Sequence, residues 1–546
     1  MVDGACIEVD AHGFHGFAYK GAADLIRALF ERHLALAIEA ARPRLVSLAP
    51  VAPQVRHWVT VPDEVERALQ VSREGNRQAW SQRIAHGLSD FVLECLKTEP
   101  NPTRIAVGGL SASEPLDIEF FRTLERRADP DRLTLDLTYV TDEPPAPAPE
   151  NAQEFATWAR RSMNLAYYEA TLEWVRLAEA ALAGRGPHPL RARIFHEKLF
   201  ALLLLDRLEE VEALCIGCLG EETDPVILVD AGYAQAILYA RFYRDGRRDY
   251  RAARACIDAA LAAAAKMPPG DNRVINSAFL HNTLALVELR EGKPDLACRL
   301  LTDALADLAR DAPDSFSREA TILFHNRARL HRRQGKPDEE LRDLQRLHDL
   351  EPGNDEAWFD RALIHQNAGR HAEALADYDR AIFWGPPLVE ALHNRAQCLR
   401  ALGRHHEARA ACDRVLEIDP DHLATRIDRA CLCQALGEIE TMARDVERGL
   451  RQAPDDARLL CLRGVVATIE GRNEAALASF EAALDRQPDL PDAWANRAAI
   501  HFRLGENERA LADIDRGLAL RDDPAMRRNR QRILKKLQDA NFHTTE

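Results

Sequence analysis

Six glycines recur with a spacing of 34 residues in the second half of the 546-residue sequence. They are Gly335, Gly369, Gly403, Gly437, Gly471 and Gly505, and no insertion interrupts the series. A fixed period of this length is typical of repeat proteins, in which each unit packs mainly on its neighbours. The period therefore predicts an elongated array of small units for this part of the chain.

Residues at fixed distances from each glycine predict a pair of helices in every repeat. A small residue stands seven positions before the glycine, such as Ala328 or Gly464, and in five copies a proline stands 17 positions after it. Glycine can adopt positive φ at a helix end, a small residue lets two helices approach closely, and proline ends the second helix. Large apolar residues stand eleven positions before most glycines, but Arg426 breaks this pattern and predicts a looser repeat.

These positions together resemble the tetratricopeptide repeat family. The resemblance is carried by segments such as NDEAWFDRALIHQNAGRHAEALADYDRAIFWGPP and PDAWANRAAIHFRLGENERALADIDRGLALRDDP, and it covers residues 316–523. It implies a right-handed α-solenoid with a concave groove that receives peptides or protein segments. Gly292 and Gly246 predict divergent pairs over residues 152–315, so we expect a mostly α-helical chain with about nine to ten helix pairs.

The ends of the solenoid are predicted from composition. Residues 524–546 form a charged helix and tail whose basic residues encircle the helix, which favours a polar cap over the alternative of a nucleic-acid contact. At the other end, residues 142–151 read DEPPAPAPEN, and a proline-rich segment of this kind is typical of a semi-rigid linker. Residues 1–141 are therefore expected to form a separate module.

That N-terminal module is predicted to be a small α/β unit. Residues 22–42 and 64–96 have helical periodicity, and residues 104–108 and 133–140 form short apolar runs typical of buried strands. The stretch RIAVGGLSASEPLDIEFFRTLERRADPDRLTLDLTYV resembles the second nucleotide-binding motif of the STAND family of signal-transduction ATPases. That resemblance implies a nucleotide-binding fold whose members often carry tetratricopeptide arms.

The nucleotide chemistry of that family is missing from the sequence. No GxxxxGK[ST] motif occurs in the chain, although backbone amides and a lysine at that loop normally hold the phosphates. Gly108 or Gly109 stands where an acidic residue would hold magnesium. We therefore expect a degenerate, truncated relative without a cofactor, which serves as a structural cap or docking surface.

Charge and composition exclude several classes of partner. A formal net charge of −15 argues against general nucleic-acid binding, and no apolar run reaches the roughly 18 residues of a membrane span. With acidic residues near Met1 in place of a secretory signal, we expect a cytoplasmic protein. The eleven cysteines predict reduced core residues, and CIGC at Cys215 and Cys218 favours packing over a redox or zinc site because a second ligand pair is absent.

Other motifs do not favour catalysis. Asp10, His12 and His15 in DAHGFHGF have the chemistry of metal ligands or of a proton-transfer pair, but an ordered loop explains them better without a third ligand or a nucleophile. The sequence contains no GxSxG and no HExxH motif. We therefore predict no enzyme activity, no catalytic residue and no metal site.

The inward-facing positions of the first helices form the predicted binding surface. Counting from the glycines, these positions carry arginine, histidine and side-chain amides, which suit an acidic or carboxylate-bearing segment; the alternative is a charged face that only keeps the array soluble. The predicted groove residues are His325, Asn326, Arg329, Arg332, Arg333, Phe359, Asp360, Gln366, Asn367, His393, Asn394, Gln397 and Arg400. An arginine follows the inward residue in Asn326-Arg327 and Asn394-Arg395, a dipeptide shared with chaperone-binding relatives, although the rest of their carboxylate clamp is not reproduced.

The sequence as a whole predicts an interaction protein. The leading hypothesis is a scaffold or adaptor that binds a protein or peptide partner, and one form of it is an accessory factor that presents a peptide or protein substrate to a separate enzyme. The alternative is a nucleotide-responsive regulator that retains binding in its N-terminal module. Neither hypothesis fixes an oligomeric state.

Overall fold

The structure of the chain is a computed structural model that divides into two compact units. It describes residues 6–11, 19–63, 65, 77–97, 99–111, 115–140, 151–164, 168–183, 188–219, 222–242, 248–385 and 388–543. Unit 1 comprises Met1–Ala368 and Asp379–Pro387, and unit 2 comprises Gly369–Tyr378 and Leu388–Glu546. His12, His15, Gly246 and nearly all of the predicted proline-rich linker lie outside the described residues.

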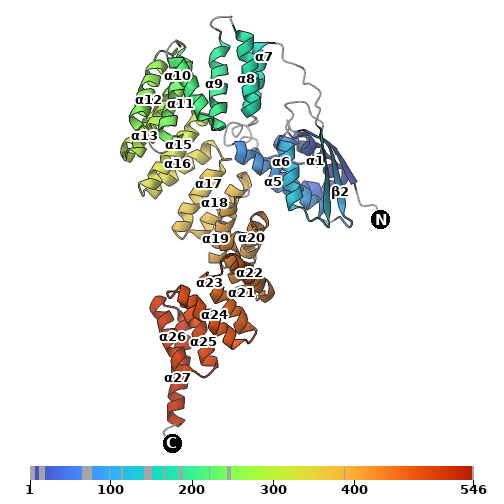
Figure 1. Cartoon of the computed structure of the whole chain (residues 1–546), viewed down its shortest axis with the longest axis vertical. Coiled ribbons are helices and arrows are strands. Elements are labelled where there is room, and N and C mark those ends of the chain that lie inside the picture. Colours follow the sequence, from blue (N-terminus) through green and yellow to red (C-terminus); the bar gives the residue numbers. More distant parts are fainter. Residues whose placement is uncertain are drawn as a thin grey trace. The chain divides into compact units, whose positions relative to one another are not determined.

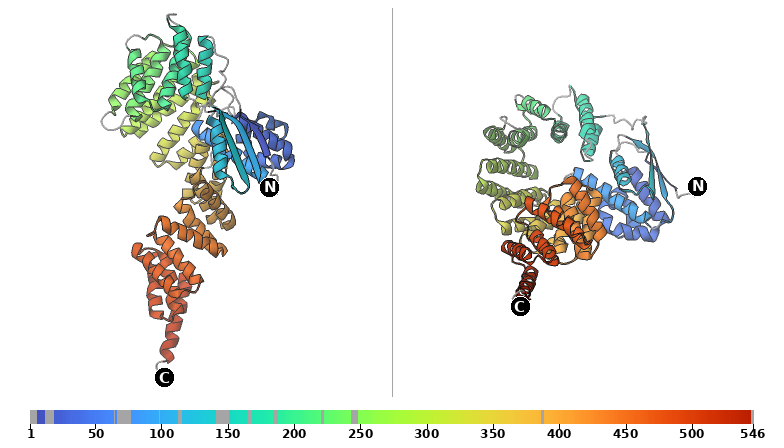
Figure 2. Two further views of the ribbon diagram at one scale, coloured as in Figure 1. Left: turned by 45° about the vertical axis from the view of Figure 1, so that its right-hand side comes forward. Right: turned by 60° about the horizontal axis from the view of Figure 1, so that its bottom comes forward.

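Unit 1 begins with a three-stranded parallel sheet in the order β1 (Cys6–Asp10), β2 (Thr103–Ser111) and β3 (Leu133–Val140). In the register, Ile7 lies beside Ile105, which lies beside Leu135. Exposed and buried residues alternate along β1, and helices cover one face of the sheet (Figure 2, left). The two strands predicted from the sequence are confirmed, whereas β1 was not predicted because its five residues, CIEVD, include only two aliphatic side chains.

Helices of this N-terminal module build its core. They are α1 (Lys20–Arg32), α2 (Leu34–Ala41), α3 (Leu45–Val51), α5 (Arg77–Leu96) and α6 (Pro115–Arg127), with 3-10 turns at Arg42–Arg44 and Pro53–His57. Phe30 stacks on Trp58 with ring centroids 4.6 Å apart. The same core includes the fully buried Trp384, from the second half of α18 (His371–Trp384), and buried Arg83 donates a hydrogen bond to its carbonyl oxygen. The sheet module and this part of the repeat region therefore share one hydrophobic core.

The repeat region of unit 1 is a series of antiparallel helix pairs, drawn from blue-green through green to yellow in Figure 1. Their bounds are α7 (Ala152–Asn164) with α8 (Tyr168–Leu182), α9 (Leu190–Leu204) with α10 (Leu208–Leu219), α11 (Pro225–Ile237) with α12 (Tyr250–Ala264), α13 (Asp271–Arg290) with α14 (Pro294–Asp311), and α15 (Phe316–Arg333) with α16 (Pro337–Leu350), followed by α17 (Asp355–Asn367). A π-helical turn, η4 (Leu238–Phe242), extends α11.

Unit 2 continues the same pattern. Its helices are α19 (Val389–Ala401) with α20 (His405–Ile418), α21 (Leu423–Leu436) with α22 (Ile439–Gln452), α23 (Ala457–Ile469) with α24 (Asn473–Arg486), and α25 (Pro491–Arg503) with α26 (Asn507–Leu520), ending in α27 (Pro524–His543). Counting α17 with α18, the described residues form ten pairs, and the predicted mostly α fold with a small α/β module is confirmed. All six periodic glycines have positive φ, as their role at helix ends requires.

Several repeats of the regular array have a polar contact between their two helices. Arg327 donates to Asp343 at 2.8 Å in one repeat and Arg497 donates to Asp513 at 2.7 Å in another, and in both cases the partners are 16 residues apart. These arginines are the second members of the dipeptides Asn326-Arg327 and Asn496-Arg497. In these two repeats the arginine of the dipeptide therefore serves packing, because it binds the second helix of its own pair.

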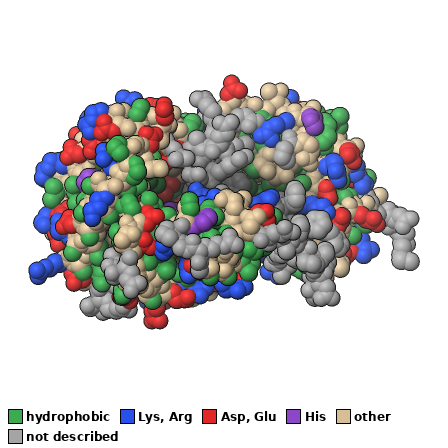
Figure 3. Space-filling model, turned by 90° about the horizontal axis from the view of Figure 1, so that it is seen from above, with side chains coloured by type: hydrophobic (Ala, Val, Ile, Leu, Met, Phe, Trp, Pro, Cys, Tyr) green, Lys and Arg blue, Asp and Glu red, His purple; other side chains and the backbone are tan. Residues whose placement is uncertain are grey.

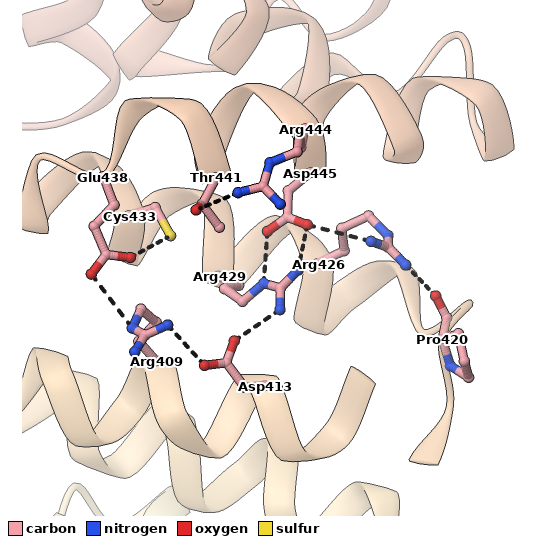
Figure 4. Close-up of polar contacts among 10 residues, drawn as sticks. All are labelled: Arg409, Asp413, Pro420, Arg426, Arg429, Cys433, Glu438, Thr441, Arg444 and Asp445. Atoms are coloured by element: carbon pink, nitrogen blue, oxygen red, sulfur yellow. Dashed lines mark hydrogen bonds and ion pairs between the residues drawn. The ribbon is translucent and has the colours of Figure 1, made fainter. Parts of the chain in front are cut away.

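Arg426 does not loosen its repeat, so that expectation was wrong. Its side chain is 3% exposed, it donates to the carbonyl oxygen of Pro420, and it lies 3.4 Å from Asp445, which also binds Arg429 at 2.6 Å (Figure 4). Arg429 reaches back to Asp413 of the preceding pair at 2.8 Å. A buried guanidinium with polar partners thus replaces the apolar bulk of other repeats.

Candidate functional site

A groove opens along the first helices of three successive pairs in unit 1. It has a volume of about 660 Å³ and is lined by the end of α11 with η4, by α13 and by α15, together with one residue of α14. This volume lies within the usual range of ligand pockets. We call it the arginine groove, after the five arginines among its lining residues, which are Tyr233, Ile237, Arg241, Asn282, Thr283, Ala285, Leu286, Leu289, Arg290, Leu301, Ile322, Asn326, Arg329, Leu330, Arg332 and Arg333.

The charged side chains that line the arginine groove are all basic. Its five guanidinium groups come from three helical elements, and no aspartate or glutamate among the described residues lines it. Such a one-sided set of charges favours a negatively charged ligand, because a guanidinium binds a carboxylate through two parallel hydrogen bonds. The charge is local, since the face shown in Figure 3 carries acidic and basic side chains interspersed.

Two of the five arginines already have acidic partners on neighbouring helices. Arg329 pairs with Glu356 of α17, and Arg332 binds Glu340 at 2.6 Å and Asp360 at 2.9 Å. Within the described part of the chain, Arg241, Arg290 and Arg333 form no ion pair, and Arg241 lies 5.6 Å from the ring centroid of Phe242. The charge of these three arginines is therefore more available to a ligand than that of Arg329 and Arg332.

The floor of the arginine groove is apolar with two side-chain amides. The Asn326 amide donates to the Asn282 side-chain oxygen at 2.8 Å, which joins α15 to α13. Each amide keeps further hydrogen-bonding capacity, which suits a peptide backbone. Ile322 beside them is 48% exposed and gives the groove an apolar surface that an occupant can cover. An occupant with both apolar and acidic side chains would match this lining.

The predicted groove residues of unit 1 separate into two groups. Asn326, Arg329, Arg332 and Arg333 line the arginine groove. The remaining residues predicted in this unit do not line it: His325, Phe359, Asp360, Gln366 and Asn367.

Asp360 and His325 do not line the arginine groove, but they lie next to one of its arginines. Asp360 is buried and binds Arg332, and its carboxylate lies 4.0 Å from the ring nitrogen of His325. Burial lowers the pKa of His325. Asp360 therefore positions Arg332, which lines the arginine groove, and neither Asp360 nor His325 is itself part of the lining.

The predicted residues of unit 2 form a different arrangement on α19. His393 is buried, with one ring nitrogen 2.7 Å from the Thr425 hydroxyl and the other 3.3 Å from Asp428, and Gln397 lies beside it. A hydrogen bond joins Asn394 to Tyr378, whose pKa burial raises above its ordinary value. Arg400 is exposed. Most of these polar groups have protein partners, so this predicted part of the surface serves mainly to join neighbouring pairs.

Sequence reasoning missed Arg241, Arg290 and Asn282, which come from the divergent pairs. A signal for one of them was present: Arg290 stands two residues before Gly292, as Arg333 stands two residues before Gly335. Extending the count from the regular repeats to the divergent ones would have placed Arg290 on the inner surface. Arg241 lies in a π-helical turn and has no such signal.

Two backbone amides at the start of the first helix of the N-terminal module are occupied by a side chain. The amino terminus of α1 follows β1, which is the position where many α/β folds bind phosphate. Here the carboxylate of buried Asp117 accepts hydrogen bonds from the backbone amides of Gly21 and Ala22, each at 2.9 Å. The protein's own carboxylate thus takes two of the donors that a phosphate could use.

Cysteines and other candidate ligands are placed as core or surface residues. Cys412 and Cys461 are buried, and burial raises the pKa of Cys215 to about 12, as expected for a packed thiol. Among the described residues, no group of three or more His, Cys, Asp or Glu side chains is arranged to hold a metal ion. A search of the described helices finds none with the length and apolarity that crossing a membrane requires.

Comparison with known families identifies the repeats. Residues 325–388, 428–491 and 470–525 match a family model described as a tetratricopeptide repeat, and residues 389–422 match a second model of the same description. The chain is thus an α-solenoid in its regular part, and that part is built of tetratricopeptide repeats, which are protein- and peptide-binding scaffolds. These matches do not include the N-terminal module, so its resemblance to STAND ATPases stays a prediction.

Comparisons with individual proteins add the following. No curated protein matches the sequence. Similar solved structures include a tetratricopeptide repeat protein from Parabacteroides merdae, with 21% identity and a TM-score of 0.34 over 49% of this chain and 98% of that one. YrrB, a TPR protein with an unusual peptide-binding site, has 16% identity and a TM-score of 0.29 over 35% and 97%. A chain of the APC/C hetero-tetramer Cut9–Hcn1 has 13% identity and a TM-score of 0.35 over 70% and 84%.

Proposed function

We propose that the protein is a non-catalytic scaffold that binds an acidic segment of a partner protein in the arginine groove. The observation that supports this most directly is the convergence of five arginines on a groove with no acidic residue among its described lining. The exposed Ile322 and the two amides on the floor favour a peptide over a small anion, because a small anion would leave them unused.

The scaffold would act by holding its partner segment for another protein. A bound acidic peptide would lie across the first helices of three pairs, with its carboxylates near Arg290 and Arg333 and its apolar side chains on the floor. Such a scaffold can serve as an accessory factor that presents a peptide or protein substrate to a separate enzyme. In this proposal the N-terminal module serves as a cap and docking surface and binds no nucleotide, in keeping with the position of Asp117.

The test uses a random dodecapeptide display library selected on the immobilised full-length protein. We expect acidic sequences with aliphatic residues to be enriched, and the double substitution R290E/R333E to weaken binding of an enriched peptide by about tenfold or more. The matched control is R299E/R346E, which makes the same charge change at exposed positions of second helices. Enrichment of sequences without acidic residues, or equal losses in both variants, would refute the proposal.

A further inference from the structure

The last helix, α27, concentrates positive charge in an acidic protein. Residues 524–538 contain six arginines and lysines and no aspartate or glutamate, although the whole chain has a formal net charge of −15. The helix packs on α25 and α26 through buried Met526 and Ile533, and it extends beyond the last helix pair (Figure 1). Its local charge is therefore opposite to that of the chain as a whole.

The structure divides these six cations into two groups. Arg527 pairs with Asp522 and Arg530 pairs with Asp515, so the charges of these two arginines are neutralised within unit 2. The other four are exposed and form no ion pair with a described residue: Arg528, Arg532, Lys535 and Lys536. We call these four residues the basic stripe.

The basic stripe lies on one face of α27. An α-helix turns by about 100° per residue, so positions i, i+4, i+7 and i+8 project from the same side. Buried Met526 and Ile533 project from the other side, which packs on α25 and α26. Only the complete set of six cations encircles the helix, as expected from the sequence. The unpaired ones form a row about 12 Å long, because eight residues separate Arg528 from Lys536.

A second helix adds a cation to the basic stripe. A cavity of about 640 Å³ between α25, α26 and α27 is lined by Arg503 of α25 together with Arg532 and Lys536. No acidic residue is found among the described residues of its lining, and Arg503 contacts only the side-chain oxygen of Asn473, at 3.3 Å. Five cations without acidic partners therefore gather at one end of unit 2.

This arrangement favours the phosphate backbone of a nucleic acid. Every residue of a nucleic-acid strand carries a negative charge, so an uninterrupted row of cations matches it better than it matches a peptide, in which acidic side chains alternate with others. The amides of Asn529 and Gln531 flank the row and can bond phosphate and sugar oxygens. A membrane surface fits less well, because the apolar side chains of α27 already pack on α25 and α26 and none is left on the basic face to enter the lipid.

We propose that α27 is a nucleic-acid contact helix, in which the basic stripe and Arg503 bind the phosphates of a nucleic-acid strand without reading its bases. The negative charge of the rest of the chain repels the strand elsewhere, so the contact is confined to α27 and its neighbour α25. The site uses none of the residues that line the arginine groove. The scaffold thus holds a nucleic acid in addition to its protein partner.

The test is the binding of a fluorescein-labelled oligo(dT) strand to the full-length protein, followed by fluorescence anisotropy at increasing NaCl concentration. Five phosphate contacts on a single strand predict an affinity that falls roughly 100-fold between about 50 and 200 mM salt. R528E/K535E and R532E/K536E change different halves of the basic stripe. Each should weaken binding about tenfold or more and make the slope of log K against log salt shallower by about 1.4.

The matched control is R299E/R346E, which reverses the same number of charges at exposed positions of unit 1 and should bind the strand as the wild type does. R290E/R333E, which disables the arginine groove, should also bind it unchanged, so failure of the proposed peptide site leaves this test intact. Thermal unfolding by circular dichroism checks that each variant is folded.

Three results would overturn the proposal. The first is the absence of saturable oligonucleotide binding at low salt. The second is an equal loss of binding in the basic-stripe variants and in R299E/R346E. The third is tighter binding of polyglutamate, or of phosphatidylcholine vesicles containing one third phosphatidylserine, than of the oligonucleotide, since α27 would then be a contact for acidic proteins or for membranes.

Discussion

Removal of Asp445 should open one repeat of unit 2 while the rest of the array remains folded. Asp445 is 3% exposed and accepts from two guanidinium groups, those of Arg426 and Arg429. Replacing it with alanine leaves Arg426 buried without an acidic partner, and burial already lowers the pKa of that group. Breaking a buried ion pair by removing one partner costs about 3–5 kcal/mol. Arg429 retains Asp413, so Arg426 accounts for most of the loss.

Hydrogen exchange detects this local effect better than a global melt, because repeat arrays open unit by unit. Peptides from α21 and α22 in D445A should exchange at least about 100-fold faster than in the wild type, since 1.4 kcal/mol is a factor of ten. The matched control is D513A, which removes the equivalent carboxylate of the last repeat. Its partner Arg497 is 18% exposed and therefore less costly to leave unpaired, so we expect a smaller effect of about 1.5–3 kcal/mol.

A second substitution tests the cause. R426L in the D445A background should restore most of the protection, because Leu392 and Leu460 occupy the same position in neighbouring repeats. Exchange in D445A no faster than in D513A, or no recovery in R426L/D445A, would refute the view that an unpaired buried guanidinium is the source of the loss.

Three further predictions concern packing and pH. A Cβ on Gly464 would lie 2.5 Å from the ring of Phe480, so G464A should destabilise α23 and α24 by about 1–3 kcal/mol, and F480L should relieve the loss in a urea titration. Burial raises the pKa of Asp117 to about 6, above its unfolded value near 3.9, so this residue's contribution to stability should grow as the pH falls from 7 to 4; D117N should flatten that slope in exchange measurements on α1. Burial lowers the pKa of His348 to about 3, so its contribution should instead be lost as the pH falls below 6.5, and H348L should abolish this loss in exchange measurements on α16.

The regular repeats were predictable from the sequence because every position is sampled several times at one spacing. The positive φ of Gly437 and the close packing of Gly464 against the second helix follow directly from that count. The parts of the fold that occur only once were harder to predict from the sequence. β1 is too short to show a convincing alternation, and the burial of Arg83 beside Trp384 joins residues 301 positions apart that share no pattern.

The candidate site was predictable in part for a related reason. The count along first helices found Asn326, Arg329, Arg332 and Arg333, because they project from a regular repeat. It also selected His393 and Asp360, since facing inward is necessary but not sufficient for reaching a ligand. Whether an inward polar residue is open or already bonded depends on the neighbouring helix, and the sequence of one repeat does not carry that information.

The core shared by the sheet module and Trp384 matters for anyone who shortens this protein. A fragment that begins after Val140 loses α5 and with it the guanidinium of Arg83 and the apolar side chains that surround the indole. Trp384, the largest fully buried side chain among the described residues, would then be exposed to water and would favour aggregation. Binding studies on the repeats alone should therefore keep the amino-terminal residues or replace Trp384 by a polar one.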